Sequence, residues 1–148
     1  MGGGAGTVGR VSIQELSPAE TEAVLAANVV GRIGCHAGGR TYVVPIIYAY
    51  EAGSVYVASV EGRKTRMMRE NPAVCFEVDE RDERGGWRSV IADGTYAELD
   101  AEGAEHALDL LARRFGRERG TRPPAAEGRE TVCFRIDLRE PSGRAVRR

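Results

Sequence analysis

This chain of 148 residues contains no run of about 18 apolar residues, so no segment of it is long enough to span a bilayer. Basic residues number 21 and acidic residues 22, and the formal net charge is −1. A chain without an overall basic field is not drawn to nucleic acid or to an anionic membrane. Two arginine-rich stretches, Arg113–Arg119 and Arg144–Arg148, include acids or lack aromatic residues for base stacking, and we interpret them as solvated faces or tails. We expect neither a membrane protein nor a nucleic-acid-binding protein.

Cysteine and histidine are also scarce. The cysteines are widely spaced without a C-x-x-C pair, the histidines are not at ligand spacing, and the sequence therefore predicts no disulfide framework and no metal site. These residues are Cys35, Cys75, Cys133, His36 and His106. Cys75 and Cys133 lie inside apolar strand patterns, which predicts buried, reduced thiols. Together with an N-terminus that lacks the apolar segment of a signal peptide, this favours a cytoplasmic protein.

The sequence also lacks the patterns of several enzyme classes. It has no internal repeat, no G-x-G-x-x-G element and no nucleophile placed beside a base. Glu77 and Asp79 alternate with apolar residues, which is typical of the exposed face of a strand rather than of an acid–base pair. We therefore predict no catalytic side chain.

Lysine occurs only once, as Lys64, whereas the remaining 20 of the 21 basic residues are arginines. It lies between an apparent strand that ends at Ser59 and an apparent helix that begins near Arg63. The first turn of a helix has unpaired N–H groups and a dipole that favours anions. Ser59, Arg63 and Lys64 would add a hydroxyl donor and two positive charges, so the sequence predicts an anion site, with phosphate as the expected anion. The alternative is a solvated helix start.

Apolar periodicity divides the chain into helices and strands. It predicts three helices, 17–27, 63–71 and 101–117, and six strands, 29–36, 41–50, 54–59, 73–79, 87–99 and 131–138. Ser17, Pro18 and Glu20 provide a cap, a first helical proline and a capping box for the first helix. Pro45 predicts an edge strand or a bulge, and Gly94 a bulge or bend.

Strands in hairpin succession favour a mainly β (α+β) fold, a six-stranded antiparallel barrel with flanking helices. We expect one folded domain at 16–139, a flexible N-terminal segment at 1–15 and a polar C-terminal tail at 140–148.

Five motifs in one order carry a resemblance to a known family. They are Tyr42-Val43-Val44-Pro45-Ile46-Ile47-Tyr48, Val55-Tyr56-Val57-Ala58-Ser59, Gly62-Arg63-Lys64, the segment from Arg69 to Asp79, and Trp87-Arg88-Ser89-Val90. From about Leu16 to Leu138, the chain resembles the pyridoxamine 5′-phosphate oxidase-like split-barrel family, and within it the branch similar to nitroimidazole-resistance reductases.

The resemblance implies an FMN-binding split β-barrel that forms a homodimer with two flavin sites at the subunit interface. It implies that backbone groups of Val44, Pro45 and Ile46 face the flavin ring. It further implies that three residues hold the phosphate and that three others approach the cofactor from the partner subunit. The first set is Ser59, Arg63 and Lys64, and the second is Trp87, Arg88 and Ser89.

The chain departs from the family at one position. Many members of this branch carry a histidine just before the serine of the phosphate strand, where this chain has Ala58. Because that histidine is tied to chemistry on nitro compounds, the departure weakens the case for nitroimidazole reduction and leaves flavin binding untouched.

Three functional hypotheses remain on this framework. In the first, a reduced nicotinamide passes hydride to FMN, and the flavin reduces a small acceptor. In the second, the barrel is a non-catalytic module that binds flavin or haem, with His36 as a weak candidate haem ligand; deazaflavin is a further cofactor alternative. In the third, the barrel is an interaction protein that has lost its cofactor, which the joint presence of Ser59, Gly62, Arg63 and Lys64 speaks against.

Overall fold

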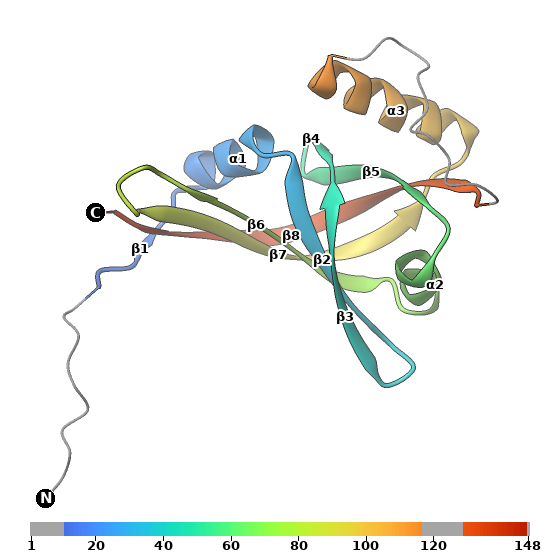
Figure 1. Ribbon diagram of the computed structural model, residues 1–148, viewed down its shortest axis with the longest axis horizontal. Helices are drawn as coiled ribbons and strands as arrows, with labels where there is room; N and C mark the ends of the chain where they lie inside the picture. Colours follow the sequence, from blue (N-terminus) through green and yellow to red (C-terminus); the bar gives the residue numbers. More distant parts are fainter. Residues whose placement is uncertain (1–10, 117–128, 148) are drawn as a thin grey trace, which may run out of the picture.

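The computed structural model describes residues 11–116 and 129–147, which form one antiparallel sheet curled into an open barrel with three helices (Figure 1). The helices are α1 (Pro18–Ala27), α2 (Arg63–Glu70) and α3 (Ala101–Phe115). The strands are β1 (Gln14–Glu15), β2 (Val30–Ala37), β3 (Arg40–Ile47), β4 (Ala49–Glu51), β5 (Ser54–Val60), β6 (Ala73–Arg81), β7 (Trp87–Glu98) and β8 (Thr131–Val146). The strand order is β3-β2-β6-β7-β8-β5-β4, with β1 added alongside β8.

Helices α1 and α3 begin at side-chain caps. In α1, the Glu20 N–H donates to Ser17 Oγ at 3.1 Å and the Ser17 N–H donates to Glu20 Oε1 at 3.0 Å, which is the expected capping box. In α3, Asp100 accepts from the Gly103 N–H at 2.8 Å, and Gly116 ends the helix in the left-handed conformation. The Ala37–Arg40 hairpin turns through Gly38 and Gly39, both with positive φ.

The sheet has eight strands, so the prediction of six was wrong. The predicted strand 41–50 is divided at Tyr48 into β3, which pairs with β2, and β4, which pairs with β5. At the division the Tyr48 N–H donates to the Val29 carbonyl oxygen at 3.0 Å, and the Tyr48 hydroxyl donates to the Leu25 carbonyl oxygen at 2.7 Å. A short β1 lies within the segment that was predicted to be flexible, while residues 1–10 are outside the described part. Both short strands were missed because two or three residues carry no readable alternation.

Residues 140–146 belong to β8 and not to a polar tail, which corrects the predicted end of the last strand at Leu138. Trp87 pairs with Val146 and Arg88 with Ala145, and both β8 residues are buried. The segment Pro141-Ser142-Gly143 looks like a break in the sequence, but a long neighbouring strand supplies the pairing that continues β8. A local pattern cannot show a partner strand that lies far away in the chain.

The sequence predicts that Pro45 and Gly94 disturb their strands, and the structure tests both predictions. Pro45 lies on edge strand β3 in unbroken register with β2, so the edge prediction was right and no bulge occurs there. The irregularity in β7 falls between Ile91 and Asp93 rather than at Gly94. Gly94 instead allows close packing, because an added Cβ would lie 2.4 Å from Ile136 Cγ2.

The core fills the inside of the barrel. Tyr48, Phe76 and Phe134 are fully buried there, and the Tyr48 and Phe76 rings meet edge to face with centroids 5.1 Å apart. Cys133 is buried as predicted, whereas Cys75 is exposed, because β6 alternates and turns Cys75 to the outer face between inward Val74 and Phe76.

Candidate functional site

Helix α2 begins without a side-chain cap, unlike α1 and α3. Its N-cap residue is Gly62, in an extended conformation. Thr65 stabilises the turn from inside: its buried hydroxyl accepts from the Gly62 N–H at 3.0 Å and donates to the Gly62 carbonyl oxygen at 2.9 Å. In the part of the chain that the structure describes, no side chain at the N-cap is hydrogen-bonded to the N–H groups of the first helical turn, so these groups are available to an anion.

Lys64 lies in this first turn and is half-buried. Burial lowers the pKa of its ammonium group, and no carboxylate in the described part of the chain pairs with it. Such a group is poorly compensated, because desolvation costs free energy that a nearby negative charge would recover. The position therefore favours a bound anion.

Arg63 connects the same turn to edge strand β3. Its guanidinium lies 5.3 Å from the centroid of the Tyr42 ring, a cation–π contact. Tyr42 is two residues before Val44, so this contact brings the start of α2 close to the Val44–Ile46 segment. Neither Tyr42 nor Thr65 was recognised as a site residue from the sequence, since only the tertiary contact links them to α2.

Ser59 completes the cluster at the end of β5. Its side chain is half-buried, and among residues 11–116 and 129–147 its hydroxyl has a single long contact, a 3.4 Å donation to the neighbouring Val60 carbonyl oxygen. A contact of that length leaves the hydroxyl free for a better acceptor. Ser59, Arg63 and Lys64 thus lie at one strand-to-helix junction, and we call these three residues the Lys64 cluster; their role in holding an anion stays a prediction.

Strand β3 contributes backbone hydrogen-bonding groups rather than charged side chains. As an edge strand of the described sheet, it leaves backbone N–H and C=O groups unpaired on its outer edge. Ile46 is buried, Val44 half-buried and Pro45 exposed, so these residues alternate across the strand. Their backbone edge, next to the Arg63–Tyr42 contact, can hydrogen-bond the polar rim of a planar ligand.

Trp87, Arg88 and Ser89 do not join this cluster within one chain. They begin β7 at the β6–β7 turn, whereas α2 lies beside the other end of these two strands (Figure 1). Arg88 is engaged there by Glu80, with Nη2 2.6 Å from Oε1. Any contact of these three residues with a ligand held at Lys64 must come from a second copy of the chain.

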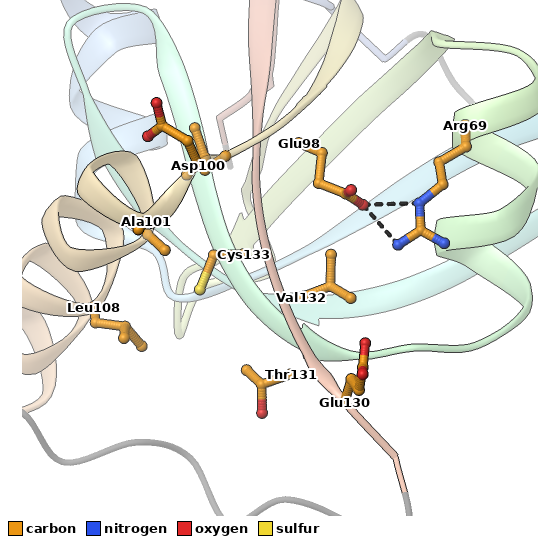
Figure 2. A pocket seen from close by; sticks show the side chains of 11 residues that line it. Arg69, Glu98, Asp100, Ala101, Leu108, Glu130, Thr131, Val132 and Cys133 are labelled. Atoms are coloured by element: carbon orange, nitrogen blue, oxygen red, sulfur yellow. Dashed lines mark hydrogen bonds and ion pairs between the residues drawn. The ribbon is translucent and has the colours of Figure 1, made fainter.

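A separate cavity of about 310 Å³ lies between α3 and the start of β8 (Figure 2). Its cation, Arg69, already donates to Glu61 at 2.6 and 2.7 Å and to Glu98 at 2.8 Å. Asp100 and Glu130 also line the cavity, so acids outnumber the single cation among the described residues that line it. A phosphate would be repelled there, which leaves the Lys64 cluster as the better anion site.

The remaining features of the described residues bear on cofactor class. No group of three histidine, cysteine or acidic side chains in ranges 11–116 and 129–147 could hold a metal ion. His36 is at the tip of the β2–β3 hairpin, where Nδ1 lies 3.0 Å from Thr41 Oγ1.

Of the helices that the structure describes, none combines the length and the apolar character that crossing a bilayer requires.

The Lys64 cluster fits a phosphorylated planar cofactor. It combines a half-buried, unpaired ammonium group, an uncapped helix N-terminus and a serine hydroxyl, beside an edge strand with free backbone groups. The first three suit a phosphate and the last suits a ring with hydrogen-bonding edges.

Comparison with known proteins identifies the same family that the sequence resembles. A family model described as pyridoxamine 5′-phosphate oxidase matches residues 17–145. An uncharacterized protein of Rhizobium meliloti is 31% identical over 144 residues, which cover 90% of this chain and 95% of the relative.

Solved structures agree in fold. A FAD-binding protein of Mesorhizobium loti is 34% identical with a TM-score of 0.76, covering 94% of this chain and 100% of that one. A proposed 5-nitroimidazole antibiotic resistance protein of Bacteroides thetaiotaomicron is 20% identical with a TM-score of 0.78, covering 93% of this chain and 90% of that one. The match over residues 17–145 and the shared split barrel show that this chain belongs to the pyridoxamine 5′-phosphate oxidase family.

Proposed function

We propose that this protein binds a flavin nucleotide, with the riboflavin phosphate at the start of α2 and the ring along β3. The half-buried ammonium of Lys64, unpaired among the described residues at an uncapped helix N-terminus, carries the proposal. Arg63 and Ser59 complete the phosphate contacts. FMN is the simplest cofactor with this group, and FAD contains the same riboflavin phosphate; the similarity to the Mesorhizobium FAD-binding protein supports FAD as the alternative.

We propose further that the protein is a flavin-dependent oxidoreductase. A bound flavin supplies hydride transfer, here from a reduced nicotinamide to a small acceptor, and the protein supplies binding and orientation. The uncompensated charge at the start of α2 fixes the phosphate, while backbone groups of β3 orient the ring edge. No acid–base side chain is required of the protein. The absorbance spectrum of the purified protein tests binding, and chromatography of the released chromophore separates FMN from FAD.

A non-catalytic flavin- or haem-binding module is the second candidate. It is favoured by Ala58, which stands where many relatives of this branch have a histidine. Steady-state oxidation of NADPH with an artificial acceptor separates the two functions, since turnover excludes pure binding. A Soret band in the purified protein would identify the haem version.

We also propose that the functional unit is a homodimer. The outer face of the sheet exposes Val43 and Ile47 of β3, Val30 of β2 and Ile91 of β7. Val30 pairs directly with Ile47, so both lie on one face. A second copy on this face would cover this apolar surface and could bring its Trp87–Ser89 segment to the bound cofactor.

Ile47→Glu should therefore shift the protein from dimer to monomer. A charge on an apolar interface must be desolvated without a partner, which strongly opposes association. Sedimentation velocity measures the outcome against the 16.0 kDa mass of one chain. Ala23→Glu, at an exposed position of helix α1, which is not part of this sheet face, is the control and should leave the mass unchanged. A wild-type protein that sediments as a monomer at all concentrations would contradict the dimer.

Flavin affinity should fall as the pH rises through the pKa of Lys64. Burial places this pKa below its ordinary value of 10.5, so deprotonation begins at lower pH than for an exposed lysine. A neutral amine loses the charge that attracts phosphate, so the dissociation constant increases with pH, whereas a phosphate already bound raises the lysine pKa again. Titrations of FMN from neutral to alkaline pH measure the effect.

Lys64→Arg is the control, because a guanidinium stays charged throughout and any titration of the flavin itself remains. Equal pH dependence in both proteins would show that Lys64 does not face the phosphate.

A further inference from the structure

A second hollow, of about 390 Å³, opens at the β6–β7 turn beside the C-terminal end of β8. This volume is within the range of small-molecule sites. It lies at the opposite end of β6 and β7 from α2, so in one chain it is separate from the Lys64 cluster. Trp87, the one tryptophan of the sequence, lines it and is half-buried.

Arg81 and Trp87 are direct cross-strand partners in this hollow. Residues directly opposite in an antiparallel pair share a face, with Cβ atoms about 5 Å apart. The hairpin therefore presents a guanidinium and an indole side by side. Neither depends on a mobile loop for its position, because both are in the sheet.

The acids of the hollow are already engaged. Glu80 binds Arg88 at 2.6 Å through Oε1 and accepts from Asn28 Nδ2 at 2.8 Å through Oε2. Asp82 Oδ1 accepts from the backbone N–H groups of Arg84 at 2.9 Å and Gly86 at 2.8 Å. These contacts hold both carboxylates in place, and neither is paired with Arg81 among the described residues.

The cations of the hollow exceed its acids. No residue in the described ranges pairs with Arg81. Arg147, which also lines the hollow, has only a 3.3 Å contact to Glu20 with a side chain 68% exposed. Such exposed pairs are weak, so Arg147 can also turn to another anion. The hollow thus offers an aromatic face beside a net positive charge.

We propose that this hollow binds the adenylyl group of a dinucleotide. An indole stacks on a purine base, and a guanidinium binds a phosphate with paired hydrogen bonds. FAD and a reduced nicotinamide dinucleotide share this group, and the inference rests on the proposed flavin function for the presence of either. Riboflavin alone has no phosphate for Arg81 to bind.

The test uses AMP as the probe and Trp87 fluorescence as the signal. Flavin-free Lys64→Ala protein is used first, so that AMP binding is measured independently of the flavin site. AMP should change the fluorescence saturably. Arg81→Gln should raise the AMP dissociation constant at least tenfold, whereas Arg84→Gln, on the same turn but outside the hollow, should leave it unchanged.

The wild-type protein then distinguishes the source of the group. If FAD-loaded protein no longer binds AMP while FMN-loaded protein does, the hollow holds the adenylyl half of FAD. If NADPH displaces AMP from FMN-loaded protein, it holds the hydride donor, and both results support the proposal. Absence of a saturable AMP signal, an equal loss in both arginine variants, or displacement of AMP by riboflavin would overturn it, even if the protein is yellow.

Discussion

Lys64→Ala should weaken flavin binding by about ten- to one-hundredfold. A hydrogen bond to a charged group contributes about 1.5–3 kcal/mol, and a factor of ten in affinity corresponds to about 1.4 kcal/mol. The ammonium is half-buried and has no competing carboxylate among the described residues, so no internal ion pair is lost in the variant. Titration of FMN with fluorescence detection measures the dissociation constant, and thermal unfolding confirms the fold.

Two further variants serve as controls for the loss of affinity expected in Lys64→Ala. Arg66→Ala removes an exposed cation from the same helix and should change affinity little, because residues two positions apart on a helix do not face each other and Arg66 therefore points away from Lys64. Lys64→Arg should keep most of the affinity, since a guanidinium also binds phosphate. If Arg66→Ala and Lys64→Ala weaken binding equally, the site responds only to total charge and the specific role of Lys64 is excluded.

Phe76→Ala should lower the free energy of unfolding by about 3–5 kcal/mol, the usual cost of truncating a buried phenylalanine. Phe76 is fully buried at the centre of β6, in edge-to-face contact with Tyr48 at 5.1 Å. An added Cβ at Gly31 would lie 2.5 Å from its ring, so the surrounding strands are already closely packed against it. The loss leaves a cavity and removes an aromatic pair. Urea denaturation with a far-UV signal measures the change.

Cys75, the residue before Phe76 in β6, provides a matched control for Phe76→Ala. Cys75→Ala should change stability by less than about 0.5 kcal/mol, because Cys75 is exposed on the opposite face of the same strand. A comparable loss in both variants would mean that the outer face of β6 is as tightly packed as the core, as it would be if a stable dimer covers it. Sedimentation under the same conditions separates that cause from an error in the assignment of the core.

The sequence predicted the local elements well where their signals are local. The cap at Ser17 and Glu20 predicted the start of α1. The start of α2 beside Lys64 was predicted from the ends of two neighbouring patterns. Capping and turn chemistry depend on residues within a few positions of each other, so one sequence suffices to read them.

Errors occurred where distant segments meet. The end of β8 was missed because Ala145 and Val146 are held by β7, more than fifty positions earlier in the chain. The expected bulge at Gly94 is a close approach to Ile136 on a neighbouring strand. In each case the relevant energy comes from a partner that local periodicity does not identify.

The candidate site also has features that local sequence determined and features that depend on contacts between distant segments. The sequence alone determined that Ser59, Arg63 and Lys64 lie at one strand-to-helix junction, because covalent neighbours and helix geometry bring them together. Only the tertiary structure decided that Lys64 is half-buried and that Arg63 lies over Tyr42. It also decided that Trp87 lies beside Arg81 at the far end of the sheet. Burial and cross-strand neighbours depend on how the sheet closes, and closure is a property of the whole chain rather than of any one segment.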